Sequence, residues 1–64
     1  MSTIFDIFKR LPDGKPLWIE SIEGLAQARR RFAELTSTKP GEYFIYSEQR
    51  GEVIERSGHK NQAA

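Results

Sequence analysis

Residues 24–38 constrain the fold most, because they form the only segment of this chain with a sustained helical period. Their apolar side chains recur at the spacing of a single helix face, at Leu25, Ala28, Phe32 and Leu35. A helix of about fourteen residues is marginal in water on its own, so this stripe needs a partner surface. We therefore expect the flanking segments, which have strand patterns, to form a sheet against which the helix packs.

Two strand patterns with a strong turn signal between them precede the helix. Residues 3–10 are rich in aromatic and β-branched side chains on both faces, which is typical of a central strand. Residues 11–15 (LPDGK) place Pro, Asp and Gly in the order of a tight turn, and residues 16–22 follow as a second strand. The pattern predicts a hairpin that leads to a helix N-cap at Gly24, with Ser21 as the alternative cap.

Two further strands are predicted after the helix. Residues 39–42 (KPGE) favour a turn, and residues 43–46 (YFIY) are the densest strand signal of the chain. A short loop at 49–51 leads to a charged strand at 52–56, which suits the edge of a sheet. Residues 57–64 have no apolar period, so we expect them to form a disordered C-terminal tail.

The resulting order is β-β-α-β-β, which predicts an α+β fold with one domain at residues 1–56. If the helix runs back across the sheet, the third strand can pair antiparallel with the first. The sheet is then four-stranded and antiparallel with the spatial order 2-1-3-4, and the helix covers one face. This order puts the two strands that are apolar on both sides in the centre.

Composition narrows the class of protein. A chain of 64 residues is near the lower limit for a stable core, since about 60% of the unfolded surface is buried at this size. The chain has no cysteine, which is compatible with a reducing cytoplasm. No apolar segment approaches the roughly 18 residues of a membrane span, and Asp6 interrupts the N-terminal apolar run. We expect a soluble cytoplasmic protein without a signal peptide or membrane contact.

A single helix covers only one face of such a sheet, so the other face needs an explanation. Strand alternation assigns Phe5, Ile7, Leu17, Ile19, Tyr43 and Ile45 to the helix side. The opposite side then displays Ile4, Phe8, Trp18, Phe44 and Tyr46, with Ile22 in the same alternation and the acids Asp6, Glu20 and Glu48 among them. A register shift by one residue would exchange the two faces and would still leave an aromatic face uncovered.

An uncovered aromatic face on a small domain favours a protein-interaction module, with a second copy or another protein as its partner. The predicted contacts are Phe8, Trp18, Phe44 and Tyr46, with Arg29 as a charged rim. The simpler alternative is that long side chains and the tail cover this surface. A second functional alternative is single-stranded nucleic-acid binding, in which bases stack on aromatic side chains of a sheet. The net charge of +1 and the acids on that face count against it.

The sequence favours neither an enzyme nor a cofactor protein. Asp6 and Glu20 are a conceivable acid/base pair, but a general acid or base needs a pocket, and a sheet this small offers little concavity. The simpler interpretation is that both are outward-facing acids that aid solubility. A small-molecule site between helix and sheet would need a cavity of about 300 Å³ or more, for which this core has little room. His59 lies in the predicted tail, so no metal site is expected. The three arginines at 29–31 (RRR) point in three directions on a helix, which predicts a solvated helix face. Arg29 differs because it lies within the apolar arc, where its stem can pack on the sheet margin while its guanidinium meets an acid or an anion. We expect no catalytic residue, cofactor, metal or small-molecule ligand.

Four segments resemble short bacterial proteins that have no assigned activity. They are DG at 13–14, PLW at 16–18, ARRR at 28–31 and PGEYFIY at 40–46. The resemblance covers nearly the whole chain up to Arg56. It implies a small α+β domain and carries no functional residue across, because the shared segments are turns and core positions.

Overall fold

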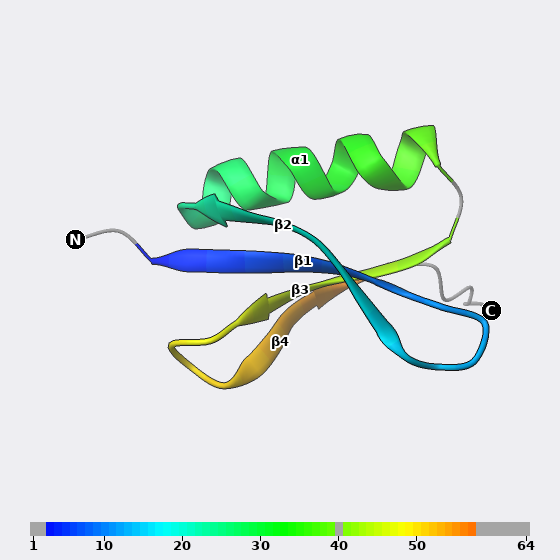
Figure 1. Ribbon diagram of the computed structural model, residues 1–64. Helices are drawn as coiled ribbons and strands as arrows, with labels where there is room; N and C mark the ends of the chain where they lie inside the picture. Colours follow the sequence, from blue (N-terminus) through cyan, green and yellow to red (C-terminus); the bar gives the residue numbers. More distant parts are fainter. Residues whose placement is uncertain (1–2, 40, 58–64) are drawn as a thin grey trace, which may run out of the picture.

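The computed structural model describes residues 3–39 and 41–57 and has four strands and one helix (Figure 1). The elements are β1 (Ile4–Arg10), β2 (Pro16–Glu23), α1 (Leu25–Thr38), β3 (Glu42–Ser47) and β4 (Glu52–Arg56). All neighbouring strands pair antiparallel in the order β2-β1-β3-β4. The predicted fold and strand order are therefore confirmed. Within the described residues, no helix has the length and apolar character needed to cross a membrane.

The turn between β1 and β2 forms as the Pro-Asp-Gly signal predicts. The Gly14 N–H donates to the Leu11 carbonyl at 2.8 Å, and the Lys15 N–H donates to Asp13 Oδ1 at 3.0 Å. Gly24 is the N-cap of α1, with φ 90° and ψ 134°. This is a backbone region that only glycine adopts without strain, so the residue type fixes where β2 ends and α1 begins.

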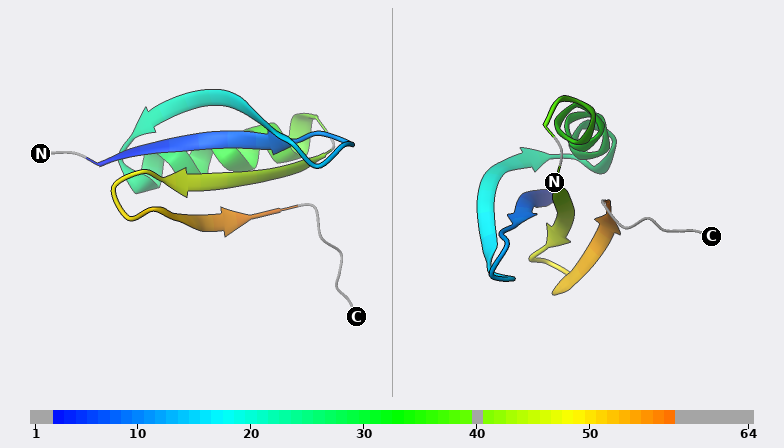
Figure 2. Two further views of the ribbon diagram at one scale, coloured as in Figure 1. Left: turned by 60° about the horizontal axis from the view of Figure 1, so that its bottom comes forward. Right: turned by 90° about the vertical axis from the view of Figure 1, so that its right-hand side faces the viewer.

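The core lies between α1 and the sheet (Figure 2). Ala28 and Phe32 of α1 are buried there, and Leu25 and Leu35 pack against them at the two ends of the helix. This confirms the predicted helix stripe. The sheet supplies Phe5, Ile7, Tyr43 and Ile45 to the same core, as strand alternation predicts.

A β-bulge at Ile19 overturns part of the predicted facing of β2. Ile7 is opposite Glu20 but Phe8 is opposite Trp18, so Ile19 is an extra residue and the alternation changes there. Ile22 consequently packs on the core, as Ile19 does. The prediction that Ile22 and Glu20 lie on the face away from the helix is therefore wrong.

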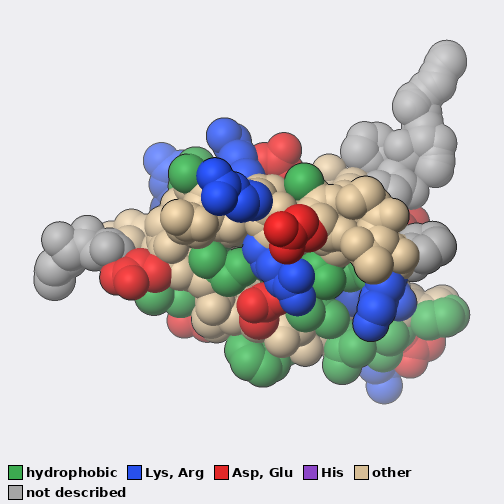
Figure 3. All heavy atoms as spheres, turned by 90° about the horizontal axis from the view of Figure 1, so that it is seen from above, with side chains coloured by type: hydrophobic (Ala, Val, Ile, Leu, Met, Phe, Trp, Pro, Cys, Tyr) green, Lys and Arg blue, Asp and Glu red, His purple; other side chains and the backbone are tan. Residues whose placement is uncertain are grey.

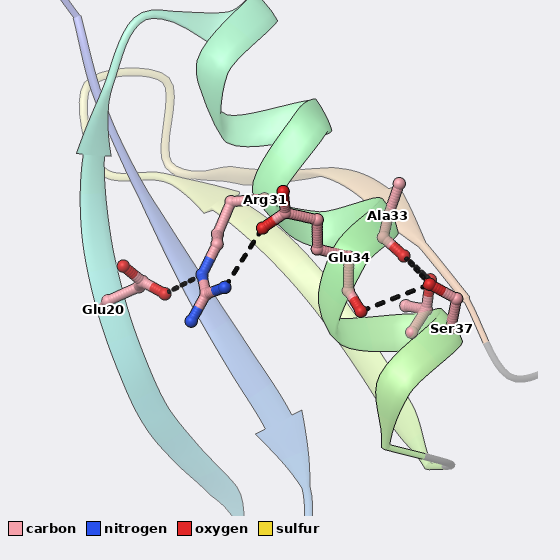
Figure 4. Close-up of polar contacts among 6 residues, drawn as sticks. Glu20, Arg31, Ala33, Glu34 and Ser37 are labelled. Atoms are coloured by element: carbon pink, nitrogen blue, oxygen red, sulfur yellow. Dashed lines mark hydrogen bonds and ion pairs between the residues drawn. The ribbon is translucent and has the colours of Figure 1, made fainter.

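Glu20 instead points toward the helix and forms an ion pair there (Figure 4). The Arg31 Nε donates to Glu20 Oε2 at 2.6 Å, while its Nη1 donates to Glu34 Oε1 at 3.1 Å. These two carboxylates raise the pKa of Arg31, chiefly through their hydrogen bonds. Arg31 thus ties α1 to β2 at the surface, although solvent screening makes such exposed pairs weak contributors to stability.

A second bulge shapes the last hairpin. Ile45 is opposite Glu55 and Tyr46 is opposite Val53, so Ile54 is the extra residue and packs against the core. The described part of the chain ends at Ser57, whose N–H donates to the Tyr43 carbonyl at 3.0 Å. The prediction of a tail at 57–64 otherwise falls on residues 58–64, which lie outside the described residues.

Candidate interaction surface

The side of the sheet opposite α1, called here the open face, has no described element against it (Figure 2). Cross-strand pairing and side-chain contacts identify its residues. They are Trp18, Ser21 and Glu23 of β2; Ile4, Asp6, Phe8 and Arg10 of β1; Glu42, Phe44 and Tyr46 of β3; and Val53 and Arg56 of β4. The structure thus brings four of the five predicted site residues together on one surface.

Three aromatic residues form a row across the open face. Trp18, Phe8 and Phe44 occupy directly opposed positions on β2, β1 and β3. The Phe8 and Phe44 rings stack with centroids 5.2 Å apart and planes at 9°, and Tyr46 meets Phe8 edge-on at 6.3 Å. The phenylalanines and Tyr46 are partly buried by these contacts, whereas Trp18 is 56% exposed. The aromatic side chains therefore partly cover one another, and the row is most open to solvent at Trp18.

This ring geometry bears on base stacking. Phe8 and Phe44 direct one face of each ring at the other, because both side chains stand on neighbouring strands. The Arg10 guanidinium carbon also lies 5.9 Å from the Phe44 ring centroid, so a charged group is close to this ring as well. Sheets that bind nucleic acid need ring faces that are free for bases. The stacking of Phe8 on Phe44 therefore counts against base stacking at these two rings.

Asp6 is buried in the open face and is only 4% exposed. Its Oδ1 accepts hydrogen bonds from the Ser21 hydroxyl and, at 3.4 Å, from Trp18 Nε1. Burial of a carboxylate is tolerated when donors surround it, and β2 supplies two. The interpretation of Asp6 as an outward-facing acid that aids solubility is therefore wrong, and the acid helps to hold the Trp18 ring in place.

Glu48 lies next to this buried acid, at the end of β3. The pKa of Glu48 is raised by Asp6, first because a protonated Glu48 can donate a hydrogen bond to it and then because two negative charges repel. The folded protein therefore binds this proton more tightly than the unfolded chain does. The resulting stabilisation is complete at pH values below the ordinary glutamate pKa of about 4.3, and it is lost as the pH rises through the raised pKa. The wild-type fold therefore carries an electrostatic penalty at neutral pH.

Glu48→Gln is expected to raise the melting temperature at pH 7. At a pH near the ordinary glutamate pKa of about 4.3, the same variant should change the melting temperature little. The amide keeps a donor for Asp6 and removes the repulsion. The measurement is thermal unfolding by circular dichroism across this pH range, in dilute protein. Glu52→Gln, in the same hairpin, is the matched control, because Glu52 is ion-paired with Arg50 and its neutralisation should not stabilise the fold. A Glu48→Gln variant that is less stable than wild type at pH 7 would contradict this account.

Charge is distributed unevenly along the open face. Asp6, Glu23 and Glu48 lie toward the end where β1 begins and β3 finishes. Arg10 and Arg56 lie toward the opposite end, where Arg10 is also ion-paired with Glu42 at 3.4 Å. The aromatic row thus has an acidic end on one side and a predominantly basic end on the other.

Arg29 does not join this surface. Its Nε donates to Glu55 Oε1 at 3.0 Å, and both residues belong to the helix side of the sheet. The predicted contact with an acid therefore forms, but the structure does not bring Arg29 to the rim of the aromatic row. Seen from the helix side, basic and acidic side chains are interspersed, as on a solvated surface (Figure 3).

The described residues offer little else that resembles a chemical site. Residues 3–39 and 41–57 contain no group of three His, Cys, Asp or Glu side chains able to hold a metal ion, and His59 lies outside them. Two surface depressions border β4, and neither is lined by Asp6 or Glu48. The larger depression includes the ion pairs Arg10–Glu42 and Arg29–Glu55, so these four charges already neutralise one another.

Comparisons with protein-family models, with curated proteins and with solved structures find no match to this chain. Its function is therefore inferred from its own residues, and the resemblance to short bacterial proteins stays a prediction.

Proposed function

We propose that this protein is a non-catalytic interaction module that binds a protein through the open face, and that the bound protein is a second copy of the chain. The aromatic row carries the proposal, because Trp18, Phe8 and Phe44 form a continuous apolar band that no described element covers. Exposed apolar bands rimmed by charges are typical of protein contact surfaces. The absence of cysteine is compatible with this role in the cytoplasm.

A second copy suits the open face because the face presents an apolar row and charges of both signs, with Glu23 and Glu48 among the acids and Arg56 among the bases. Two identical surfaces of this kind can bury their apolar rows against each other and place opposite charges at the rim. Four strands about 4.8 Å apart and about 20 Å long present roughly 400 Å² in projection, which is less than the ~800 Å² per partner of a standard interface. We therefore expect a weak dimer with a dissociation constant in the micromolar range or above.

Single-stranded nucleic-acid binding is the competing function. The mutual stacking of Phe8 and Phe44, and the acids at one end of the open face, weigh against it.

The wild type is expected to shift from monomer to dimer in sedimentation equilibrium between about 10 µM and about 1 mM protein. Titration of a fluorescent mixed-sequence single-stranded oligonucleotide at low salt should show no binding. A protein that stays monomeric throughout this range would overturn self-association, and tight oligonucleotide binding that weakens steeply with salt would establish the competing function.

A further inference from the structure

The open face carries an excess of negative charge. Arg10 is ion-paired with Glu42 of its own chain at 3.4 Å, so these two charges balance. The other charged residues that the structure describes on this face are three acids and one base, which are Asp6, Glu23, Glu48 and Arg56. With all of them ionised, the net charge of the face is −2, although that of the whole chain is +1. Two such faces have the same net charge in every orientation and repel each other.

Two of these acids, Asp6 and Glu48, lie side by side and are called here the acid pair. Asp6 is 4% exposed, and the donors to its carboxylate are the neutral groups of Ser21 and Trp18. Glu48 comes directly after β3 and lies within reach of this carboxylate. A proton on Glu48 forms a hydrogen bond with Asp6 and removes the repulsion, and both effects raise the pKa of Glu48.

The groups around the acid pair do not neutralise it. On β3 the residue opposite Asp6 is Tyr46, a neutral phenol, and β4 places the apolar Val53 beside it. Glu23 of β2 adds a further negative charge at this end of the face. In the hairpin after β3, Arg50 is ion-paired with a glutamate of β4 at 3.6 Å. Proton uptake is therefore the way in which the charge at this end can fall.

A dimer through the open face brings the acid pair into the contact. The face presents roughly 400 Å² in projection, against ~800 Å² per partner in a standard interface, so a stable contact has to use all of it. Contact with a second copy removes water from Glu48 and adds the negative charge of the partner's face. Both effects raise the pKa of Glu48 further in the dimer, so the dimer holds protons that the free chain releases.

We propose that self-association through the open face is coupled to proton uptake at the acid pair, so that the dimer becomes tighter as the pH falls. This inference rests on the proposed self-association. The gain in affinity is complete at pH values below the pKa of Glu48 in the free chain, and it is lost as the pH rises through the higher pKa in the dimer. Because the pKa is already raised in the free chain, this range lies above the ordinary glutamate pKa of about 4.3.

Sedimentation equilibrium at two pH values tests the coupling. The dissociation constant of the wild type is expected to be about tenfold lower at about pH 4.5 than at about pH 7.5, since a pKa difference of one unit corresponds to tenfold in affinity. Glu48→Gln should dimerise more tightly than the wild type at the higher pH and should respond much less to pH. Glu52→Gln is the matched control and should keep the wild-type response, because Glu52 is opposite the buried Ser47 and lies off the open face. His59 titrates in this range too, but all three proteins contain it.

Circular dichroism at both pH values verifies that each protein is folded. Three results would overturn the coupling while leaving the open face as the contact surface: a wild-type dimer equally tight at both pH values, a Glu48→Gln dimer weaker than the wild type at the higher pH, or a Glu48→Gln dimer with the full wild-type pH response. A wild type that stays monomeric at both pH values would instead remove the proposed function, and the coupling with it.

Discussion

Phe44→Glu is expected to abolish self-association at concentrations at which the wild type is dimeric. Phe44 lies in the aromatic row, on the central strand β3, and its ring is stacked on Phe8. A carboxylate there would be desolvated against the apolar surface of the partner. Truncation of central aromatic contacts commonly costs 2 kcal/mol or more, which is about 30-fold in the dissociation constant.

The fold should survive this change, because Phe44 is only partly buried. The variant loses one aromatic stack, worth about 0.5–1.5 kcal/mol, and the partial burial of the ring. Ala33→Glu introduces the same charge at an exposed helix position and should leave dimerisation unchanged. If Phe44→Glu does not fold, Trp18→Ala provides the test with less loss of internal packing, since Trp18 is 56% exposed. A folded Phe44→Glu protein that dimerises like the Ala33→Glu control would show that the aromatic row is not the contact surface.

Phe32→Ala is expected to unfold most of the protein at room temperature. Phe32 is buried between α1 and the sheet, and removing such a ring typically costs about 3–5 kcal/mol. A single core in a domain of 64 residues rarely supplies more than about 3–5 kcal/mol, so the loss of this one ring is comparable with the whole stability of the fold.

Urea unfolding followed by circular dichroism in dilute protein checks this expectation. Arg30→Ala is the matched control at a neighbouring exposed helix position, where a substitution usually changes stability by about 0.5 kcal/mol or less. A loss below about 1 kcal/mol for Phe32→Ala would mean that α1 does not pack on the sheet through this side chain.

The fold could be predicted from sequence because local signals agree with one another. The Pro-Asp-Gly turn, the helix stripe from Leu25 to Leu35 and the doubly apolar strands each favour the same arrangement. The structure departs from that prediction at the bulges, because strict alternation assumes regular strands. The separation of Ile19 and Ile22 was an available signal, since two residues three apart cannot both face the core of a regular strand.

The candidate surface could be predicted only in outline. Phe8, Phe44 and Tyr46 share the open face because alternation in β1 and β3 is regular, and Trp18 joins them because it precedes the bulge in β2. The burial of Asp6 depends on donors from β2 that the bulge brings into register, so composition alone could not reveal it. The placement of Arg29 depends on which sheet edge lies beneath the helix, and its partner Glu55 is 26 residues away in the chain.

Amide chemical shifts recorded by NMR at increasing protein concentration test the central claim most directly, because they report which residues enter a contact between copies. From about 10 µM to about 1 mM, amide signals of the open-face strands around Phe8, Phe44 and Trp18 should move together along one binding curve. Signals from the exposed side of α1, such as Arg30 and Ala33, should stay in place. Shifts confined to α1, or no shifts anywhere at the highest concentration, would contradict the account.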